Sequence, residues 1–139
     1  MIDKELIKNK MADIEKYLKE LDPILKSGSR IIIEDNLRLH TVERLFQLIV
    51  DTAVDINTHI ITASDFNVPE DSYSTFVALG ENKVLSMDFV LRIAPSVGLR
   101  NLIVHKYGNV DLKKMVEDVI NEIGDYVEYL RLINSFLDK

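Results

Sequence analysis

The spacing of apolar residues near the end of the chain constrains the fold most strongly. From position 112 onward these residues recur three or four positions apart, which is the period of an α-helix and not the alternation of a β-strand. Asp111 precedes the run and is a favourable N-cap residue. The pattern predicts one amphipathic helix of about seven turns, with an apolar stripe made of Leu112, Met115, Val116, Val119, Ile120, Ile123, Val127, Leu130, Ile133 and Leu137.

The first half of the chain repeats this helical spacing. We expect a helix over residues 3–20 that stops near Asp22, because the residue before Pro23 avoids the helical region. Residues 26–30 are predicted to form a loop. The run 31–33 is three isoleucines, too short for a strand without a partner, and is interpreted as the approach to the second helix.

The second helix is predicted over residues 35–62 and is the longest. After a loop at 65–72, a short helix is expected over 73–79, with Gly80 as its C′ residue. A fourth helix should begin at residue 83 or 84 and meet Pro95, which removes a backbone hydrogen bond and should kink or restart the helix about one turn before Arg100. The sequence thus predicts an all-α, antiparallel up-down four-helix bundle with an additional short helix, forming a single domain over residues 1–139.

Composition excludes several classes of site and location. The chain contains no cysteine, so disulfides, thiolate nucleophiles and cysteine-ligated metals are absent. Its start does not read as a signal peptide, and no apolar run approaches the roughly 20 residues of a membrane span, so we expect a soluble, cytoplasmic protein without membrane contact. A net charge of −6 argues against a broad nucleic-acid surface. Residues 80–110 carry four basic side chains against two acidic ones, so any RNA contact should be local.

The segment 100–107 contains four side chains that can bind a phosphate or transfer a proton: Arg100, Asn101, His105 and Tyr107. Arginine offers a fixed fork of donors to phosphate oxygens, and histidine can take and give a proton near neutral pH. Asn101 and His105 are four residues apart and share one helix face, with Arg100 roughly 100° around from Asn101. Such a set can hold and cleave a phosphodiester, and we predict no cofactor and no metal for this chemistry.

Arg-Asn-x3-His-x-Tyr resembles the signature of the HEPN superfamily. Together with segments 56–60, 68–76 and 97–99, the whole chain is similar to the HepT-like toxins. The resemblance implies an all-helical, metal-independent endoribonuclease that acts as a homodimer, with the motif lining the dimer cleft. It also implies a partner, an MntA-type minimal nucleotidyltransferase antitoxin that silences the toxin by transferring AMP onto the motif tyrosine, here Tyr107. Pro95 departs from the family pattern and bears on how Arg100 is presented.

The residues themselves suggest transesterification, in which a base removes the ribose 2′-OH proton, the oxygen attacks phosphorus, and an acid protonates the leaving 5′-oxygen. Arg100 would stabilise charge on the phosphorane, and Asn101 would orient His105 or a phosphate oxygen. The motif holds one histidine whereas the reaction needs an acid and a base, and a two-fold dimer supplies a second copy. DNA lacks the nucleophile and should not be cut.

Each of these groups also has a structural interpretation. Arg100 can bridge to an acidic residue such as Asp51 or Asp55, and His105 can be a cap or a packed, hydrogen-bonded residue. Tyr107 can be a turn residue with its hydroxyl in water. Asp51 and Asp55 are interpreted as a solvated face or as partners of Arg44. His40 and His59 show no metal-ligand spacing and are both predicted to be structural.

Two other functions stay open at this point. The chain can be a non-catalytic helical module that docks on a nucleotidyltransferase and presents a substrate to it. It can also be a structural bundle whose dimer interface is its whole function. The pair Arg100 and His105 discriminates between these functions and catalysis, because a docking module needs neither residue.

Overall fold

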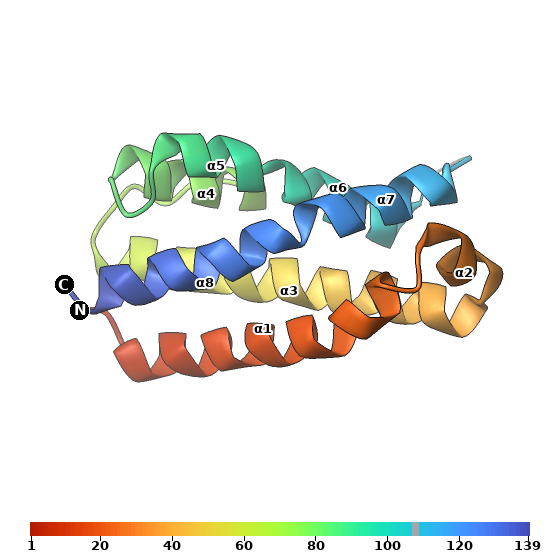
Figure 1. Ribbon diagram of the computed structural model, residues 1–139. Coiled ribbons are helices and arrows are strands. Elements are labelled where there is room, and N and C mark those ends of the chain that lie inside the picture. The colour runs from red at the N-terminus through yellow and green to blue at the C-terminus, as the bar shows by residue number, and fades with distance from the viewer. Residues whose placement is uncertain (107–108) are drawn as a thin grey trace.

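The computed structural model describes residues 1–106 and 109–139. Over these ranges the chain forms eight helices and no strand, as Figure 1 shows. The helices are α1 (Lys4–Leu25), α2 (Ser29–Glu34), α3 (Asn36–Ala63), α4 (Ser72–Glu81), α5 (Met87–Ile93), α6 (Pro95–His105), α7 (Leu112–Glu122) and α8 (Gly124–Leu137). In the part of the chain that is described, no helix is both long and apolar enough to cross a membrane.

The helices make an up-down bundle of four columns, which are α1, α3, the pair α5 and α6, and the pair α7 and α8 (Figure 1). The two chain ends lie together at one end of the bundle, where the Met1 ammonium donates to the Ala63 carbonyl at 3.2 Å. The α4 helix packs on α3 and α5 as the additional short helix. The predicted all-α four-helix bundle is therefore confirmed, with two of its columns each divided in two.

One hydrophobic core joins the helices, because each amphipathic helix turns its apolar stripe inward. Two tyrosines of α8 are fully buried in it, and their hydroxyls find polar partners as burial requires. The Tyr129 hydroxyl donates to Asn57 Oδ1 at 2.6 Å. The Tyr126 hydroxyl lies 2.6 Å from Ser96 Oγ on α6. These bonds fix α8 against both α3 and the helix that carries the motif.

Two boundaries predicted between the first and the second long helix were wrong. The α1 helix does not stop at Asp22 but continues to Leu25 with Pro23 inside its last turn; burial of Leu21 and Leu25 in the core offsets the proline's cost. Residues 26–30 are not wholly a loop, because α2 begins at Ser29 and buries Ile32 completely. Asp35 then caps α3 by accepting from two backbone N–H groups, close to the predicted start.

Gly80 was predicted to end a helix but lies inside α4. A Cβ at this position would lie 2.9 Å from Met87 Cε and 3.0 Å from Val90 Cγ2. The glycine therefore permits the close approach of α5, which begins at Met87 after its N-cap Ser86 and not at residue 83 or 84. Its role is tertiary, which a local pattern does not distinguish from capping.

The last predicted helix is two helices, α7 and α8, because the regular hydrogen-bond ladder breaks at Ile123. Ile123 keeps right-handed helical angles (φ −63°, ψ −31°), and the Tyr126 N–H donates to the Ile123 carbonyl, three residues back, at 3.1 Å. The tightened turn bends the column (Figure 1). As a result α7 packs on α2 and α6, whereas α8 packs on α1 and α5.

Candidate functional site

The motif lies on α6, a helix that starts afresh at a proline. Pro95 occupies the first turn of α6, where its missing N–H is tolerated, and α5 ends two residues earlier at Ile93. The predicted restart before Arg100 is confirmed. Leu99 and Ile103 are buried, so one face of α6 faces the core and the remaining faces are free to carry polar chemistry.

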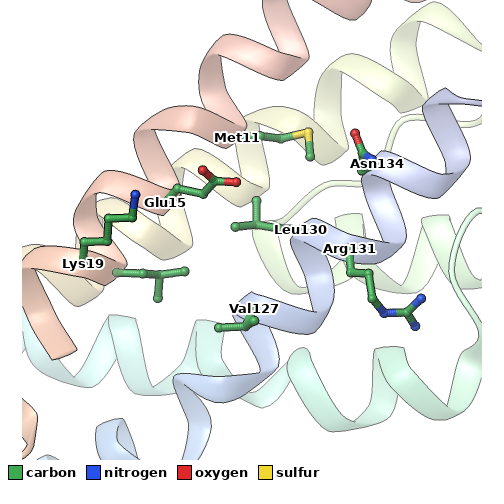
Figure 2. A pocket seen from close by; sticks show the side chains of 8 residues that line it. Met11, Glu15, Lys19, Val127, Leu130, Arg131 and Asn134 are labelled. Carbon is green, nitrogen blue, oxygen red and sulfur yellow. The ribbon is translucent and has the colours of Figure 1, made fainter.

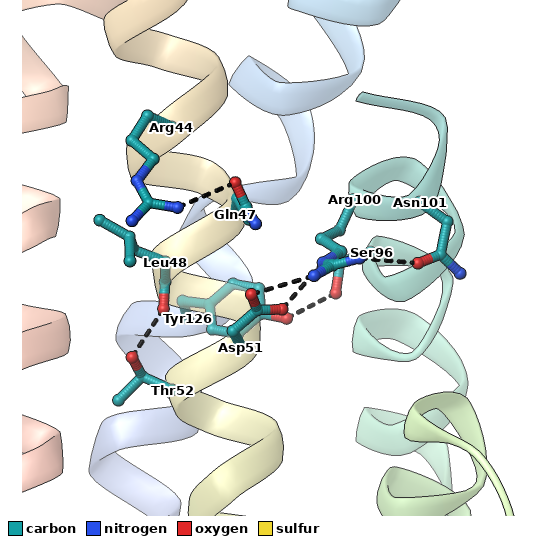
Figure 3. Close-up of polar contacts among 9 residues, drawn as sticks. All are labelled: Arg44, Gln47, Leu48, Asp51, Thr52, Ser96, Arg100, Asn101 and Tyr126. Carbon is teal, nitrogen blue, oxygen red and sulfur yellow. Dashed lines mark hydrogen bonds and ion pairs between the residues drawn. The ribbon is translucent and has the colours of Figure 1, made fainter. Parts of the chain in front are cut away.

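Arg100 reaches from α6 across to α3, where Asp51 accepts two of its hydrogen bonds (Figure 3). Arg100 Nε donates to Asp51 Oδ1 at 2.8 Å, and Nη2 donates to Oδ2 at 3.1 Å. This is the bidentate geometry in which guanidinium and carboxylate match best. The Arg100 side chain is 23% exposed and that of Asp51 is 42% exposed, so the pair stands at the edge of the core and in reach of water.

Asn101 and His105 lie on the outer side of α6 and are both exposed. Asn101 Oδ1 accepts from Arg100 Nη1 at 3.3 Å, which links the first two motif side chains directly. Arg100 and Asn101 lie side by side in Figure 3. His105 is the last residue of α6, four residues after Asn101 on the same face. The fold therefore brings Arg100 and Asn101 together and presents His105 on the same helix.

The chain leaves α6 through Lys106, whose backbone is left-handed at φ +43°. Its N–H donates to the Leu102 carbonyl at 2.8 Å, which closes the helix end. Its ammonium pairs with the carboxylate of Glu43 on α3, a side chain that is only 12% exposed. Tyr107, the predicted modification site, lies outside the described residues.

The alternative partners predicted for the acidic residues were partly correct. Asp51 does bridge to Arg100, but Asp55 pairs with Lys10 at 3.7 Å. Of the two interpretations of this acidic pair, a solvated face or a pairing with Arg44, the second was wrong, because Arg44 donates to Gln47 Oε1 at 3.2 Å. The i+3 position on its own helix is the nearer acceptor for this exposed side chain.

The interpretation of His59 as structural is confirmed, because its Nε2 accepts the Asp3 N–H at 3.1 Å and ties the start of the chain to α3. His40 is exposed, and its structural role stays a prediction. Over residues 1–106 and 109–139, no three His, Asp or Glu side chains gather in a way that could hold a metal ion.

A groove of about 520 Å³ lies between α1 and α8, away from Arg100, Asn101 and His105 (Figure 2). Its lining contains none of Arg100, Asn101 and His105, and it consists of Met11, Glu15, Leu18, Lys19, Val127, Leu130, Arg131 and Asn134. A neighbouring hollow of about 430 Å³ continues it towards Ile123. The groove is apolar at its floor and carries charges of both signs at its edge.

Sequence reasoning missed two groups that hold the motif helix. Ser96 is buried and lies against Tyr126, one turn before Arg100. Glu43 holds Lys106, one residue after His105. A signal for the second group was present, because Glu43, Gln47 and Asp51 repeat every four residues along one line of a helix that is otherwise mostly apolar. For Ser96 there was none, since an isolated serine has no pattern.

The sequence matches the family described as Ribonuclease HepT-like over residues 14–133. It is 32% identical to the tRNA nuclease HepT of Aphanizomenon flos-aquae over 140 aligned positions, covering 98% of this chain and 92% of that protein. It is 25% identical to the mRNA nuclease HepT of Shewanella oneidensis, covering 94% and 98% of the two chains.

A solved structure of a toxin bound to its antitoxin has the same fold. It is the tri-AMPylated Shewanella oneidensis HEPN toxin in complex with an MNT antitoxin. The two chains superpose with a TM-score of 0.86 at 26% sequence identity, over 97% of this chain and 99% of that one. The likeness therefore extends over the whole bundle, including the helix that carries the motif.

Proposed function

Because the chain belongs to the Ribonuclease HepT-like family, we propose that it is the toxin of a toxin–antitoxin pair and acts as an endoribonuclease. Two relatives that align over nearly their whole length are named as nucleases of tRNA and of mRNA. The structural relative is a HEPN toxin bound to its antitoxin. RNA is accordingly the substrate class, and the cytoplasm is the compartment in which such a substrate is met.

Arg100 and His105 are the residues that carry the reaction in this proposal. The 2′-oxygen attacks the adjacent phosphorus, the 5′-oxygen leaves, and the product ends in a 2′,3′-cyclic phosphate. Arg100 places its remaining N–H donors on the phosphorane oxygens, which carry more charge in the transition state than in the ground state. His105 moves the proton, and Asn101 orients Arg100 or the phosphate. The side chains suffice without a metal.

The reaction needs an acid and a base, and a homodimer provides two copies of His105 across one cleft. Exposure of apolar side chains next to the motif supports this arrangement. Leu102 is 42% exposed and Val104 is 40% exposed, and both lie on α6 between Arg100 and His105. Apolar side chains at this position are typical of a surface that another chain covers.

The partner that follows from the family is an MntA-type nucleotidyltransferase antitoxin, which silences the enzyme by transferring AMP onto Tyr107. The tri-AMPylated relative supports this part of the proposal. Tyr107 lies two residues after His105, so an adenylyl group there would add bulk and negative charge beside the proton-transfer group. Both effects would keep an RNA phosphate away.

The observation that carries the proposal is the placement of Arg100, Asn101 and the exposed His105 on one helix whose register is held from two neighbouring helices. The test is incubation of the unmodified chain with total RNA in excess EDTA. We compare the wild type with His105→Ala and with His59→Gln, a histidine that binds only the start of the chain.

We expect cleavage by the wild type and by His59→Gln, with cyclic phosphate ends, and none by His105→Ala. An oligonucleotide with a single 2′-deoxy sugar at the cut site should resist cleavage there. Failure of the unmodified wild type to cut RNA would replace this proposal with that of a docking module for a nucleotidyltransferase. Cleavage that disappears only in EDTA would remove the metal-independent mechanism.

A further inference from the structure

Two acidic side chains of α3 hold the motif helix, one at its middle and one just past its C-terminal end. Asp51 holds Arg100, and Glu43 holds Lys106. The order of the contacts is reversed along the two helices, so α3 and α6 run antiparallel there. Eight residues of α3 span about 12 Å and six residues of α6 about 9 Å, so the two contacts fit one straight stretch of packed helix.

The Asp51 contact decides which donors of Arg100 are available. A guanidinium has five N–H groups in one plane. Two of them point at the Asp51 carboxylate, through Nε and Nη2, and one points from Nη1 at Asn101 Oδ1. Two N–H groups remain, one on each terminal nitrogen. The bidentate bond fixes the plane in which they lie, which a single hydrogen bond would not do.

The Arg100–Asp51 ion pair does not favour RNA binding through its charge. A carboxylate that stands 2.8 Å from the guanidinium cancels much of its field and repels a phosphate. With a net charge of −6 the chain has little positive potential to spare. Asp51 therefore weakens the attraction of Arg100 for the RNA phosphate in the ground state. Its benefit comes in the transition state, because there the orientation of the guanidinium counts more than its net charge.

We propose that Asp51 is the positioning residue of the active site, which orients Arg100 so that its two remaining donors meet the phosphorane oxygens. This inference rests on the proposed ribonuclease function and adds a residue outside the motif to it. Asp51 touches no substrate and acts only through Arg100. Removal of its charge should therefore lower turnover without weakening RNA binding.

The experiment compares Asp51→Asn with Asp55→Asn, which makes the same change one turn away on α3 at a carboxylate that pairs with Lys10. Cleavage of one RNA oligonucleotide is followed at varied concentration. For Asp51→Asn we expect kcat to fall roughly ten- to hundredfold, as for a misplaced catalytic group, with KM unchanged or lower. For Asp55→Asn we expect both constants within about twofold of the wild type. Equal constants for the two variants, or a raised KM for Asp51→Asn, would overturn the inference.

A second pair of variants separates orientation from folding. Lysine at position 100 cannot make the bidentate bond, so Asp51→Asn should change kcat less than about twofold when it is added to Arg100→Lys. A loss of folded protein would instead persist in the Arg100→Lys background, and that result would reduce Asp51 to a structural role. If the wild type itself does not cut RNA, the ribonuclease proposal fails and this inference fails with it. If the wild type cuts RNA and the cycle shows no coupling, only the role of Asp51 fails.

Discussion

The two sides of this bundle differ in how their polar groups are used. On the α3–α6 side, Asp51 holds Arg100 of α6, and Glu43 holds Lys106, the C-cap residue of that helix. On the α1–α8 side lies a groove of about 520 Å³, and its lining contains none of Arg100, Asn101 and His105. The volume of a cavity therefore does not show where the catalytic side chains lie. A long, unbranched sugar–phosphate backbone needs aligned donors on an open face, whereas an apolar groove suits a compact ligand.

The largest effect is expected from removal of the Arg100 side chain on the α3–α6 side. Arg100→Ala should lower kcat/KM for RNA about 10²- to 10³-fold, because the donors that stabilise charge in the transition state are lost. Arg92→Ala is the matched control, since Arg92 also pairs with an aspartate, Asp125 at 3.3 Å, but on the far part of the α5–α6 column. Initial rates on one RNA oligonucleotide measure both variants. Equal losses would mean that α6 has no special role.

The second prediction concerns the buried hydrogen bond that joins α8 to α3, the helix that carries Asp51 and Glu43. Tyr129→Phe removes the hydroxyl that donates to Asn57 Oδ1 at 2.6 Å and leaves this buried oxygen without its donor. We expect the free energy of unfolding to fall by about 1–3 kcal/mol. Chemical denaturation followed by circular dichroism measures this change.

The control for that experiment is Tyr73→Phe, which removes the same atom from a tyrosine that is 43% exposed. Its effect should stay within about 0.5 kcal/mol. If the two variants lose the same stability, the Tyr129 bond does not stabilise the core. RNA cleavage by the folded fraction of Tyr129→Phe should be close to that of the wild type, since the Tyr129 hydroxyl bonds to Asn57 and Ala53 of α3 and not to Arg100, Asn101 or His105.

Local sequence signals predicted the motif side better than the rest of the fold. Pro95 acts within one turn, and its restart of the helix was foreseen together with the shared face of Asn101 and His105. The predictions at Pro23 and Gly80 were wrong for one reason, which is that packing in the core decides the roles of both residues. Burial of Leu25 carries α1 past Pro23, and the approach of Met87 explains Gly80. The sequence offers Asp51 as one of two possible acidic partners of Arg100, with Asp55 as the other, but the bidentate geometry that gives Asp51 a role is visible only in three dimensions.

The third prediction extends the comparison to Glu122, a carboxylate on which burial and like charges outweigh the attraction of Lys114. Burial and the neighbouring carboxylates of Asp118 and Asp125 raise the pKa of Glu122 at the end of α7, whereas Asp51 and Glu43 face cations. A raised pKa in the folded state means that ionisation of Glu122 costs stability. This cost is absent below the ordinary carboxyl pKa of 4.5 and appears as the pH rises through the folded value.

Glu122→Gln mimics the protonated form and should therefore stabilise the chain at pH 7. The gain should stay below about 1 kcal/mol because water screens this half-buried group. It should vanish below about pH 4. Thermal unfolding midpoints of the variant and the wild type across this pH range test the sign. A gain that grows as the pH falls would show that the pKa of Glu122 is lowered instead.

The smallest effect is expected in the α1–α8 groove, where it sharpens the contrast with α6. Val127 lines both hollows and is 62% exposed, so Val127→Ser should change the free energy of unfolding by no more than about 0.5 kcal/mol. It should leave RNA cleavage unchanged, because the two hollows that Val127 lines contain neither Arg100 nor Asp51. Leu130, one turn on and 8% exposed, provides the comparison, since Leu130→Ala should cost about 2–5 kcal/mol through the cavity it leaves. A loss of cleavage in Val127→Ser without a loss of stability would place part of the substrate site in the groove and remove the division between the two sides.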